Sequence, residues 1–246
     1  MNEAPPGPLG DAAIRAITFD ATGTLIHAPR LVEIYVDCFE RHQRPVTAEA
    51  LRGLIPDVWR EFDLAHVAGV ERFAAHPGGA EGWWGRFIAR ICERLELEPP
   101  TRFLVRELFD RFGRAESWQL FPEVERSLEE LREAGLRFAV VSNWDHRLPG
   151  VLDGLGLDRW IETVVYSAAI GVEKPHRAIF DHAVAELELE PHQVVHVGDR
   201  RRNDLEGAQA AGLGALHLDR WRDRGDLRDL AELPCLVAPY KGTASR

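Results

Sequence analysis

The hydrophobic positions of this chain follow two kinds of pattern. Short, nearly continuous apolar runs at 16–19, 137–142 and 194–198 are typical of buried parallel strands. Longer stretches repeat apolar residues every three or four positions, as an amphipathic helix does. The segment from Glu81 to Leu95 is the clearest of these. The two patterns together predict an α/β protein.

From residue 113 to residue 235, strands and helices alternate. Strands are expected at 137–142, 162–166, 194–198 and 214–218, and helices at 122–134, 148–157, 176–188 and 203–211. Pro122 and Gly135 flank the first of these helices as its start and stop signals. Such alternation is typical of a doubly wound parallel sheet, a Rossmann-like core with helices on both faces.

Only helical patterns occur between the first strand and this alternating region. Four helices are expected there, at 31–42, 47–66, 81–95 and 100–112. Pro56 lies inside the second of them and is expected to kink or split it. The sequence therefore predicts a block of helices inserted into the α/β core.

This pattern divides the chain into a core, an insert and two tails. The expected ranges are 13–29 and 113–235 for the core, 30–112 for the insert, and 1–12 and 236–246 for tails predicted to be disordered. The crossings between core and insert, near 26–30 and 113–120, are the expected hinges.

Polar residues follow the predicted strands at the edge where open α/β sheets bind ligands. The first strand stops at Asp20 and continues Ala-Thr-Gly-Thr-Leu, where Gly23 allows a tight turn. Later in the chain come Ser142-Asn143 after one strand, Lys174-Pro175 before a helix, Gly198-Asp199 after another strand, and Asn203-Asp204 at the next helix.

These four groups, in this order, resemble the four motifs of the haloacid dehalogenase superfamily of hydrolases, over about residues 14–235. The string from Lys174 to Phe180 is also similar to the Lys-Pro-x-x-x-x-Phe pattern of that family. The chain is identified from these motifs as a member of the superfamily. The resemblance implies that residues 30–112 form a helical cap over the active site.

The resemblance also implies roles for individual residues. The catalytic set is Asp20 as nucleophile, with Thr22, Ser142 and Lys174, and the Mg²⁺ set is Asp20, Thr22, Asp199 and Asp204. Mg²⁺ is a hard cation that prefers such oxygen ligands. Asp204 is expected beside Lys174, in a supporting position. Asn143, Thr24 and Arg60 are expected to contact the substrate.

Thr22 departs from the family pattern. Most phosphatases of the superfamily carry an aspartate two residues after the nucleophile as a general acid and base, which is typically worth roughly 10²–10⁴-fold in rate. P-type ATPases have the similar Asp-Lys-Thr-Gly-Thr, and 2-haloacid dehalogenases also lack this aspartate, because halide leaves without a proton. His27 and His146 lie next to motifs and are candidates to replace it.

Three functions remain open at this point. A Mg²⁺-dependent phosphatase acting through an aspartyl-phosphate on Asp20 is favoured by the acidic pair at 199 and 204. A metal-independent 2-haloacid dehalogenase is favoured by Trp59-Arg60, which resembles the cap Trp-Arg of those enzymes. The third is a catalytically weak protein that binds a phosphorylated metabolite or a partner.

Other features of the cap and the core allow weaker hypotheses. Trp83 is expected to be available to the substrate, whereas Trp84 lies on the apolar stripe and is expected in the core of the cap. The run Arg200-Arg201-Arg202 could attract an anionic substrate or could simply be solvated.

Composition narrows the possible partners. A formal net charge of −10 argues against a nucleic-acid partner, since phosphate backbones are bound by clustered Lys and Arg. There is no apolar run long enough to span a bilayer, and the three cysteines are widely spaced, as in a reducing compartment. We expect a cytoplasmic monomer or homodimer that acts on a small phosphorylated molecule.

Overall fold

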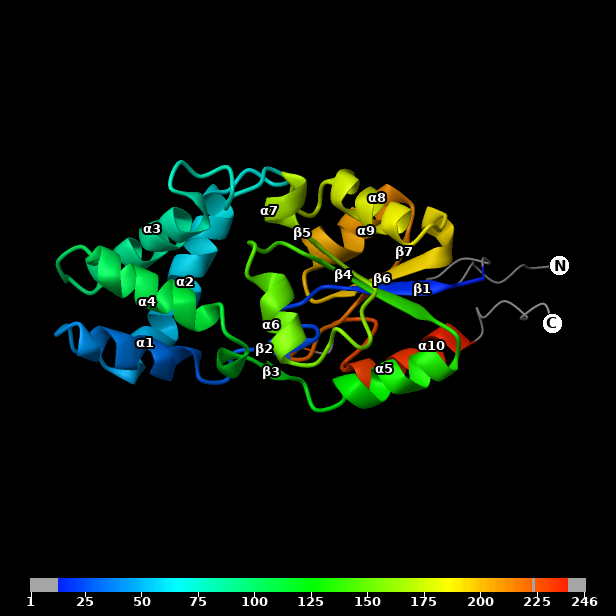
Figure 1. Ribbon diagram of the computed structural model, residues 1–246, viewed down its shortest axis with the longest axis horizontal. Coiled ribbons are helices and arrows are strands. Elements are labelled where there is room, and N and C mark those ends of the chain that lie inside the picture. The colour runs from blue at the N-terminus through cyan, green and yellow to red at the C-terminus, as the bar shows by residue number, and fades with distance from the viewer. Residues whose placement is uncertain (1–12, 223, 239–246) are drawn as a thin grey trace.

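A computed structural model describes residues 13–222 and 224–238 (Figure 1). Its centre is a five-stranded sheet in the order β5-β4-β1-β6-β7, with every neighbouring pair parallel. The strands are β1 (Ala16–Phe19), β4 (Arg137–Ser142), β5 (Thr163–Tyr166), β6 (Val194–Gly198) and β7 (Gly214–His217). The predicted parallel sheet is confirmed, and β1 lies between β4 and β6.

Helices cover both faces of this sheet. One face carries α5 (Val124–Glu133), α6 (Leu148–Gly154) and α10 (Leu233–Val237), and the other carries α8 (Arg177–Glu186) and α9 (Gly207–Ala211). Alternate residues of β1 serve the two faces, as the pleat requires: Ile17 and Phe19 join one apolar cluster and Ala16 joins the other. The doubly wound arrangement is therefore confirmed.

Short elements connect these layers. They are α7 (Ser167–Ile170), three 3₁₀ turns at Ala115–Ser117, Pro191–Gln193 and Leu230–Glu232, and a π-helical turn at Arg201–Glu206 that leads into α9. The helix predicted from residue 203 thus begins with a wider turn at 201. This π-helical turn contains Asp204.

Four helices stand apart from the sheet, on the left of Figure 1. They are α1 (Leu31–Arg41), α2 (Ala48–Ala65), α3 (Gly79–Arg94) and α4 (Arg102–Phe112), and they enclose an apolar cluster of their own. Thr47 and Thr101 cap α2 and α4 by accepting a bond from a backbone N–H. We refer to α1–α4 and their loops as the cap.

Pro56 does not split α2, contrary to one of the two sequence-based expectations. The helix runs through it from Ala48 to Ala65. Proline leaves the carbonyl four residues earlier without its partner. That carbonyl belongs to Arg52, and both residues are exposed, so water can take the missing bond.

The chain enters and leaves the cap through two short strands that lie side by side. β2 (Ile26–His27) pairs antiparallel with β3 (Gln119–Leu120). At the far end of the chain, α10 extends to Val237, so the predicted disordered tail begins too early; residues 1–12 and 239–246 lie outside the described residues. Among the helices that the structure describes, none is long and apolar enough to cross a membrane.

Candidate active site

The parallel register brings the predicted site residues together at the carboxyl edge of the sheet. Ser142, at the end of β4, donates a 2.8 Å hydrogen bond to Oδ1 of Asp20, at the end of β1. Lys174 Nζ donates to the same Oδ1 at 2.6 Å, to Asp204 Oδ1 at 2.6 Å and to the carbonyl of Val141 at 2.8 Å. All three ammonium protons are used, so the side chain of Lys174 is held in one position.

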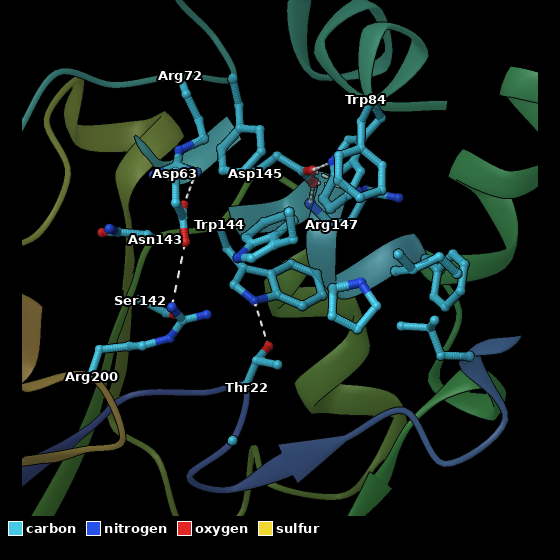
Figure 2. Close-up of a pocket in the computed structure, with 18 of the residues that line it drawn as sticks. Thr22, Asp63, Arg72, Trp84, Ser142, Asn143, Trp144, Asp145, Arg147 and Arg200 are labelled. Carbon is cyan, nitrogen blue, oxygen red and sulfur yellow. Dashed lines mark hydrogen bonds and ion pairs between the residues drawn. The ribbon is translucent and has the colours of Figure 1, made fainter. Parts of the chain in front are cut away.

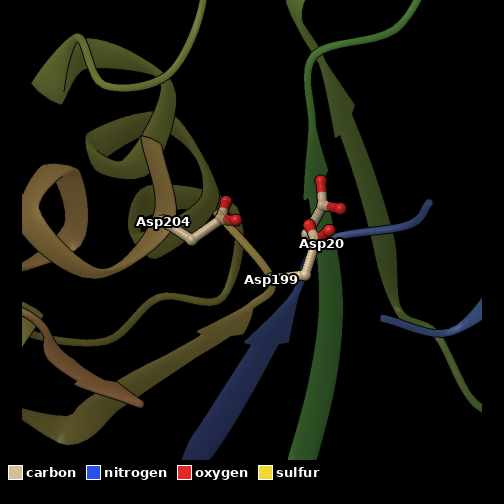
Figure 3. Close-up of side chains that lie close together, drawn as sticks. All are labelled: Asp20, Asp199 and Asp204. Carbon is tan, nitrogen blue, oxygen red and sulfur yellow. The ribbon is translucent and has the colours of Figure 1, made fainter. Parts of the chain in front are cut away.

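Asp199, at the end of β6, completes a cluster of three carboxylates (Figure 3). One oxygen from each of Asp20, Asp199 and Asp204 lies within 4.8 Å of the others. Ligands on opposite sides of a Mg²⁺ ion at its usual bond length of about 2.1 Å are about 4.2 Å apart. The three oxygens therefore need little movement to share one such ion.

The loop after Asp20 lies directly against this cluster. Gly23 has φ +88, and a Cβ at this position would lie 2.5 Å from Oδ2 of Asp199. Any larger residue would clash with the carboxylate of Asp199. Residues other than glycine also rarely adopt this positive φ. The glycine thus allows the nucleophile loop to approach the third carboxylate.

The charges of the cluster do not balance. Burial raises the pKa of Asp199 to about 7, and the neighbouring charges of Asp20 and Asp204 act in the same direction. Burial opposes the charge of Lys174, but the carboxylates of Asp20 and Asp204 outweigh it and raise its pKa. Arg200 Nε lies 3.9 Å from Asp199 Oδ2, so three carboxyl groups stand beside one ammonium and one guanidinium. When all three are ionised, the site keeps an excess of negative charge that a divalent cation would relieve.

Asn143 holds the backbone of the lysine in place. Its Oδ1 accepts a 2.7 Å bond from the backbone N–H of Lys174, and its Nδ2 donates a 3.0 Å bond to the carbonyl of Lys174. Asn143 was predicted to contact the substrate, and it does line the cavity described next. Its amide group, however, is occupied in orienting Lys174.

A cavity of about 630 Å³, lined in part by Asp20, opens between the sheet edge and the cap. Figure 2 shows Thr22, Trp84 and Trp144 around it. Thr22 is exposed to it, and the indole nitrogen of Trp144 donates a 3.0 Å hydrogen bond to the Thr22 hydroxyl. The volume is that of a site for a small molecule. The arrangement has the components of a reaction centre: a candidate nucleophile, fixed cationic and hydroxyl donors, a cluster of oxygen ligands, and an enclosed space beside them.

Comparison with known proteins agrees with this geometry. The family model for haloacid dehalogenase-like hydrolases matches residues 14–212. The chain belongs to this family. A relative from Xenopus laevis, haloacid dehalogenase-like hydrolase domain-containing protein 3, is 35% identical over 210 residues, which cover 82% of each chain.

Two further similarities involve proteins of stated activity. The glyceraldehyde 3-phosphate phosphatase of Methanopyrus kandleri is 27% identical over 216 residues and covers 84% of each chain. The solved structure of the L-2-haloacid dehalogenase from Xanthobacter autotrophicus has a TM-score of 0.69 and 22% identity, and covers 92% of this chain and 98% of that one. The second likeness shows the shared fold of this haloacid dehalogenase-like hydrolase.

Sequence reasoning missed His196, which lies inside β6 of this haloacid dehalogenase-like hydrolase. Its ring is completely buried, with Nδ1 2.9 Å from the hydroxyl of Thr18 and Nε2 3.2 Å from Oδ1 of Asp204. Burial lowers its pKa, and the positive charge of Lys174 acts in the same direction. A histidine in the middle of the apolar run Val-Val-His-Val-Gly was the available signal.

The expectations for the two cap tryptophans were reversed. Trp83 is buried among other cap aromatics, whereas Trp84 lines the cavity and donates a 3.0 Å bond from its indole nitrogen to Asp145. Both residues lie on α3, one position apart. Which of them faced the core could be decided only by how α3 packs against α2 and α4.

Three of the residues singled out in the sequence do not line the cavity. His27 and His146, the candidates to replace the missing general acid, are absent from its lining among the described residues. His27 instead stacks on Phe121, with ring centroids 4.5 Å apart. Thr24 is completely buried and also lies outside the lining.

Arg60 and Arg200 do reach the cavity, from opposite sides. The side chain of Arg60 is 67% exposed and pairs with Asp57 at 2.8 Å. Arg200 is the member of the arginine run that lines the cavity, and it lies 3.4 Å from Asp63 of the cap (Figure 2). Arg201 and Arg202 are exposed outside the lining.

One buried ion pair joins the cap to the core beside the cavity, and a second, within the core, is linked to the cap by a hydrogen bond. Arg72, in the loop between α2 and α3, pairs with Glu173 at 2.8 Å, directly next to Lys174. Arg147 pairs with Asp145 at 2.6 Å and donates to the carbonyl of Phe109 on α4. These pairs fix where the cap side chains lie relative to Asp20.

Proposed function

We propose that this protein is a Mg²⁺-dependent phosphatase that acts on a small phosphorylated molecule through an aspartyl-phosphate on Asp20. The observation that carries the proposal is the group formed by the partly buried Asp199 and the buried Asp20, Asp204 and Lys174, in which three carboxyl groups stand against one ammonium. A phosphate ester and a divalent cation are the ligands that such a group would bind together.

The hydrogen bonds of Asp20 indicate which of its oxygens attacks. Oδ1 accepts bonds from Ser142 and Lys174, and no such bond to Oδ2 is found among the described residues. In the first step Oδ2 forms a bond to phosphorus as the bond from phosphorus to the leaving oxygen breaks. In the second step water attacks the phosphorus of the aspartyl-phosphate, which releases inorganic phosphate and restores the carboxylate.

The other residues of the site orient Asp20 or stabilise the negative charge of the phosphoryl group. Lys174 and Ser142 fix the carboxylate of Asp20, and the ammonium group lowers the energy of negative charge that develops on the phosphoryl oxygens. Asp20, Asp199 and Asp204 would hold Mg²⁺, which when bound neutralises phosphate charge. His196 holds Asp204 against Lys174 and is a positioning residue.

The dehalogenase alternative has less support. Thr22 suits it, because a halide needs no proton to leave. Trp59 and Arg60, the pair that suggested dehalogenation, both line the cavity, but the guanidinium of Arg60 is already paired with Asp57. Metal-free displacement also gives no role to the excess carboxylates. The phosphatase relative from Methanopyrus kandleri also supports phosphate chemistry.

The test is turnover of acetyl phosphate and p-nitrophenyl phosphate with Mg²⁺ and with EDTA. We expect hydrolysis only with Mg²⁺, and Asp20→Asn should reduce it to the uncatalysed background. Asp37→Asn is the matched control, since Asp37 is exposed on α1. Dehalogenation of 2-chloropropionate in EDTA would overturn the proposal. So would a complete lack of turnover with both phosphates when ligands still raise the melting temperature, which would indicate a binding protein.

A further inference from the structure

Aromatic rings form much of the wall of the cavity over Asp20. The cap contributes Trp59 from α2, Trp84 and Phe87 from α3, and Phe109 from α4, and the core contributes Trp118 and Trp144. Trp59 and Trp84 stack with ring centroids 5.8 Å apart, and Trp118 and Trp144 lie 5.1 Å apart. The space beside the candidate nucleophile is thus bounded by flat apolar surfaces.

The polar atoms of three of these indoles are already used. Trp84 donates to Asp145, Trp118 donates to the carbonyl of Phe112, and Trp144 donates to Thr22, each at 3.0 Å. These bonds hold the rings in fixed positions and leave ring carbons to face a ligand. Such ring faces pack well against flat apolar groups.

The buried arginines of the wall are also satisfied by the protein. Arg147 is 9% exposed and pairs with Asp145, and Arg72 is 8% exposed and pairs with Glu173 and Asp63. Neither cation needs a carboxylate from a ligand. These two buried cations therefore call for no second anionic group on the ligand.

A second observation is independent of the wall. Position 22 offers a threonine hydroxyl, which accepts a bond from Trp144, and no carboxyl group is available there to protonate a leaving oxygen. Without general acid help, a leaving group must be stable as an anion. Phenols and hydroxyl groups on heteroaromatic rings meet this requirement, and aliphatic alcohols do not.

We propose that the substrate is a phosphate monoester of an aromatic hydroxyl, with its ring between Trp84 and the sheet edge. The proposal rests on the phosphatase function of Asp20. In the first step the bond between phosphorus and the aryl oxygen breaks, and the aryl oxide leaves with the electron pair and takes a proton from water. The aspartyl-phosphate is then hydrolysed as described above.

The experiment compares four substrates in Mg²⁺: acetyl, phenyl, 2-naphthyl and glycerol 1-phosphate. Phenol and 2-naphthol are leaving groups of similar acidity, so their comparison isolates the effect of ring area. The second ring adds about 50 Å² of apolar surface, which at roughly 25 cal/mol per Å² corresponds to about a tenfold higher kcat/KM. We expect this gain to come mainly from KM, and glycerol 1-phosphate to be the poorest of the four.

Substitutions of Trp84 test whether this residue causes the preference for the larger ring. Trp84→Ala should bring the ratio of 2-naphthyl to phenyl phosphate close to one, and Trp84→Phe should keep most of it. Trp221→Ala is the matched control, because Trp221 is 83% exposed and lies outside the cavity lining. In case Trp84→Ala does not fold, inhibition of acetyl phosphate turnover by benzylphosphonate and by propylphosphonate tests the wild type directly. The aromatic compound should inhibit at several-fold lower concentration.

The outcomes separate the two proposals. If acetyl phosphate is hydrolysed but the aryl phosphates show equal kcat/KM and glycerol 1-phosphate is as good, the aromatic substrate class is wrong and the phosphatase function stands. Equal inhibition by the two phosphonates would have the same meaning. If none of the four is hydrolysed, the phosphatase proposal fails, and the substrate class fails with it.

Discussion

The indole nitrogen of Trp144 donates a hydrogen bond of 3.0 Å to the hydroxyl oxygen of Thr22 (Figure 2). The two residues are 122 positions apart, one in the loop after β1 and the other in the loop after β4. A bulky donor thus occupies the neighbourhood of the position where many members of the superfamily carry a general acid. This contact shapes what a carboxylate introduced there would do.

Thr22→Asp should increase hydrolysis of alkyl phosphates more than that of aryl phosphates, because only alkoxides need a proton to leave. The gain should be smaller than the roughly 10²–10⁴-fold that general acid catalysis is worth. The Trp144 N–H would donate to the new carboxylate and favour its charged form, so a smaller fraction of it would hold the proton that a general acid must give. Steady-state kcat/KM for glycerol 1-phosphate and phenyl phosphate measures both effects.

The double variant Thr22→Asp/Trp144→Phe should therefore cleave glycerol 1-phosphate faster than Thr22→Asp alone. Thr22→Val, which keeps the shape and removes the hydroxyl, serves as the control and should not gain alkyl activity. If the wild-type protein already cleaves alkyl and aryl phosphates at equal rates, another group supplies the proton and this account of Thr22 is wrong.

The affinity for Mg²⁺ should depend on pH through Asp199. Its pKa is raised to about 7, so below pH 7 the carboxyl holds a proton that the cation must displace. Affinity should fall by up to about tenfold per pH unit below pH 7 and level off above it. Calorimetry between pH 5.5 and 8.5, in buffers of different ionisation enthalpy, should detect proton release near pH 6. Asp199→Asn should bind weakly at every pH; a wild-type affinity that is constant over this range would contradict the prediction.

Gly23→Ala should abolish Mg²⁺ binding and turnover, because the new Cβ would lie 2.5 Å from Asp199 Oδ2. Gly135→Ala is the matched control. Gly135 also has a positive φ, +83, but nothing lies within 4 Å of its Cβ position. The Gly135→Ala variant should lose about 1–2 kcal/mol of unfolding free energy, which is the cost of placing alanine in this backbone conformation. It should remain active. Similar Mg²⁺ affinities in the two variants would show that contact with Asp199 is unimportant.

Asp145→Asn should destabilise the protein at pH 7 and much less in acid. Burial alone would raise the pKa of Asp145, but hydrogen bonds and charge from Arg147 outweigh it and hold the pKa below its ordinary value. The folded state therefore binds fewer protons than the unfolded state. The stabilisation is complete above about pH 4 and is lost as the pH falls further.

Removing one partner of such a buried pair typically costs about 3–5 kcal/mol. Urea unfolding at pH 7 should show a loss of this size for Asp145→Asn, and the difference from wild type should narrow below pH 4. Glu130→Gln, in an exposed pair with Arg126, should change little at either pH. If the unfolding free energies of wild type and Asp145→Asn differ by the same amount down to pH 3, Arg147 does not stabilise the charged form of Asp145.

The sequence contained enough to predict the core and the polar residues that meet at the sheet edge. Asp20 and Asp199 each follow a buried apolar strand and Ser142 ends one, and parallel strands bring their carboxyl ends to one edge. Their proximity therefore follows from local pattern and sheet topology alone. Lys174 was found through the order of the motifs, and the structure places its Nζ 2.6 Å from both Asp20 and Asp204.

The packing of the cap helices determines which of their side chains face the cavity. A helical stripe shows that α3 has an apolar face, but both Trp83 and Trp84 border it and differ by only one position. Which of them is buried depends on how α3 is rotated against α2 and α4. The sequence pattern predicted that Trp83 would face the cavity, whereas in the packed cap it is Trp84 that does so.

By itself, the sequence determined the parallel core, the helical insert and the carboxylates at the strand ends, since these depend on short-range periodicity and on where each strand stops. Tertiary structure alone decided the pairing of Trp144 with Thr22, of Arg72 with Glu173 and of His196 with Asp204. Loop and strand residues far apart in the chain meet only when sheet and cap close around the cavity. No periodicity records such contacts, because they depend on the positions of whole elements.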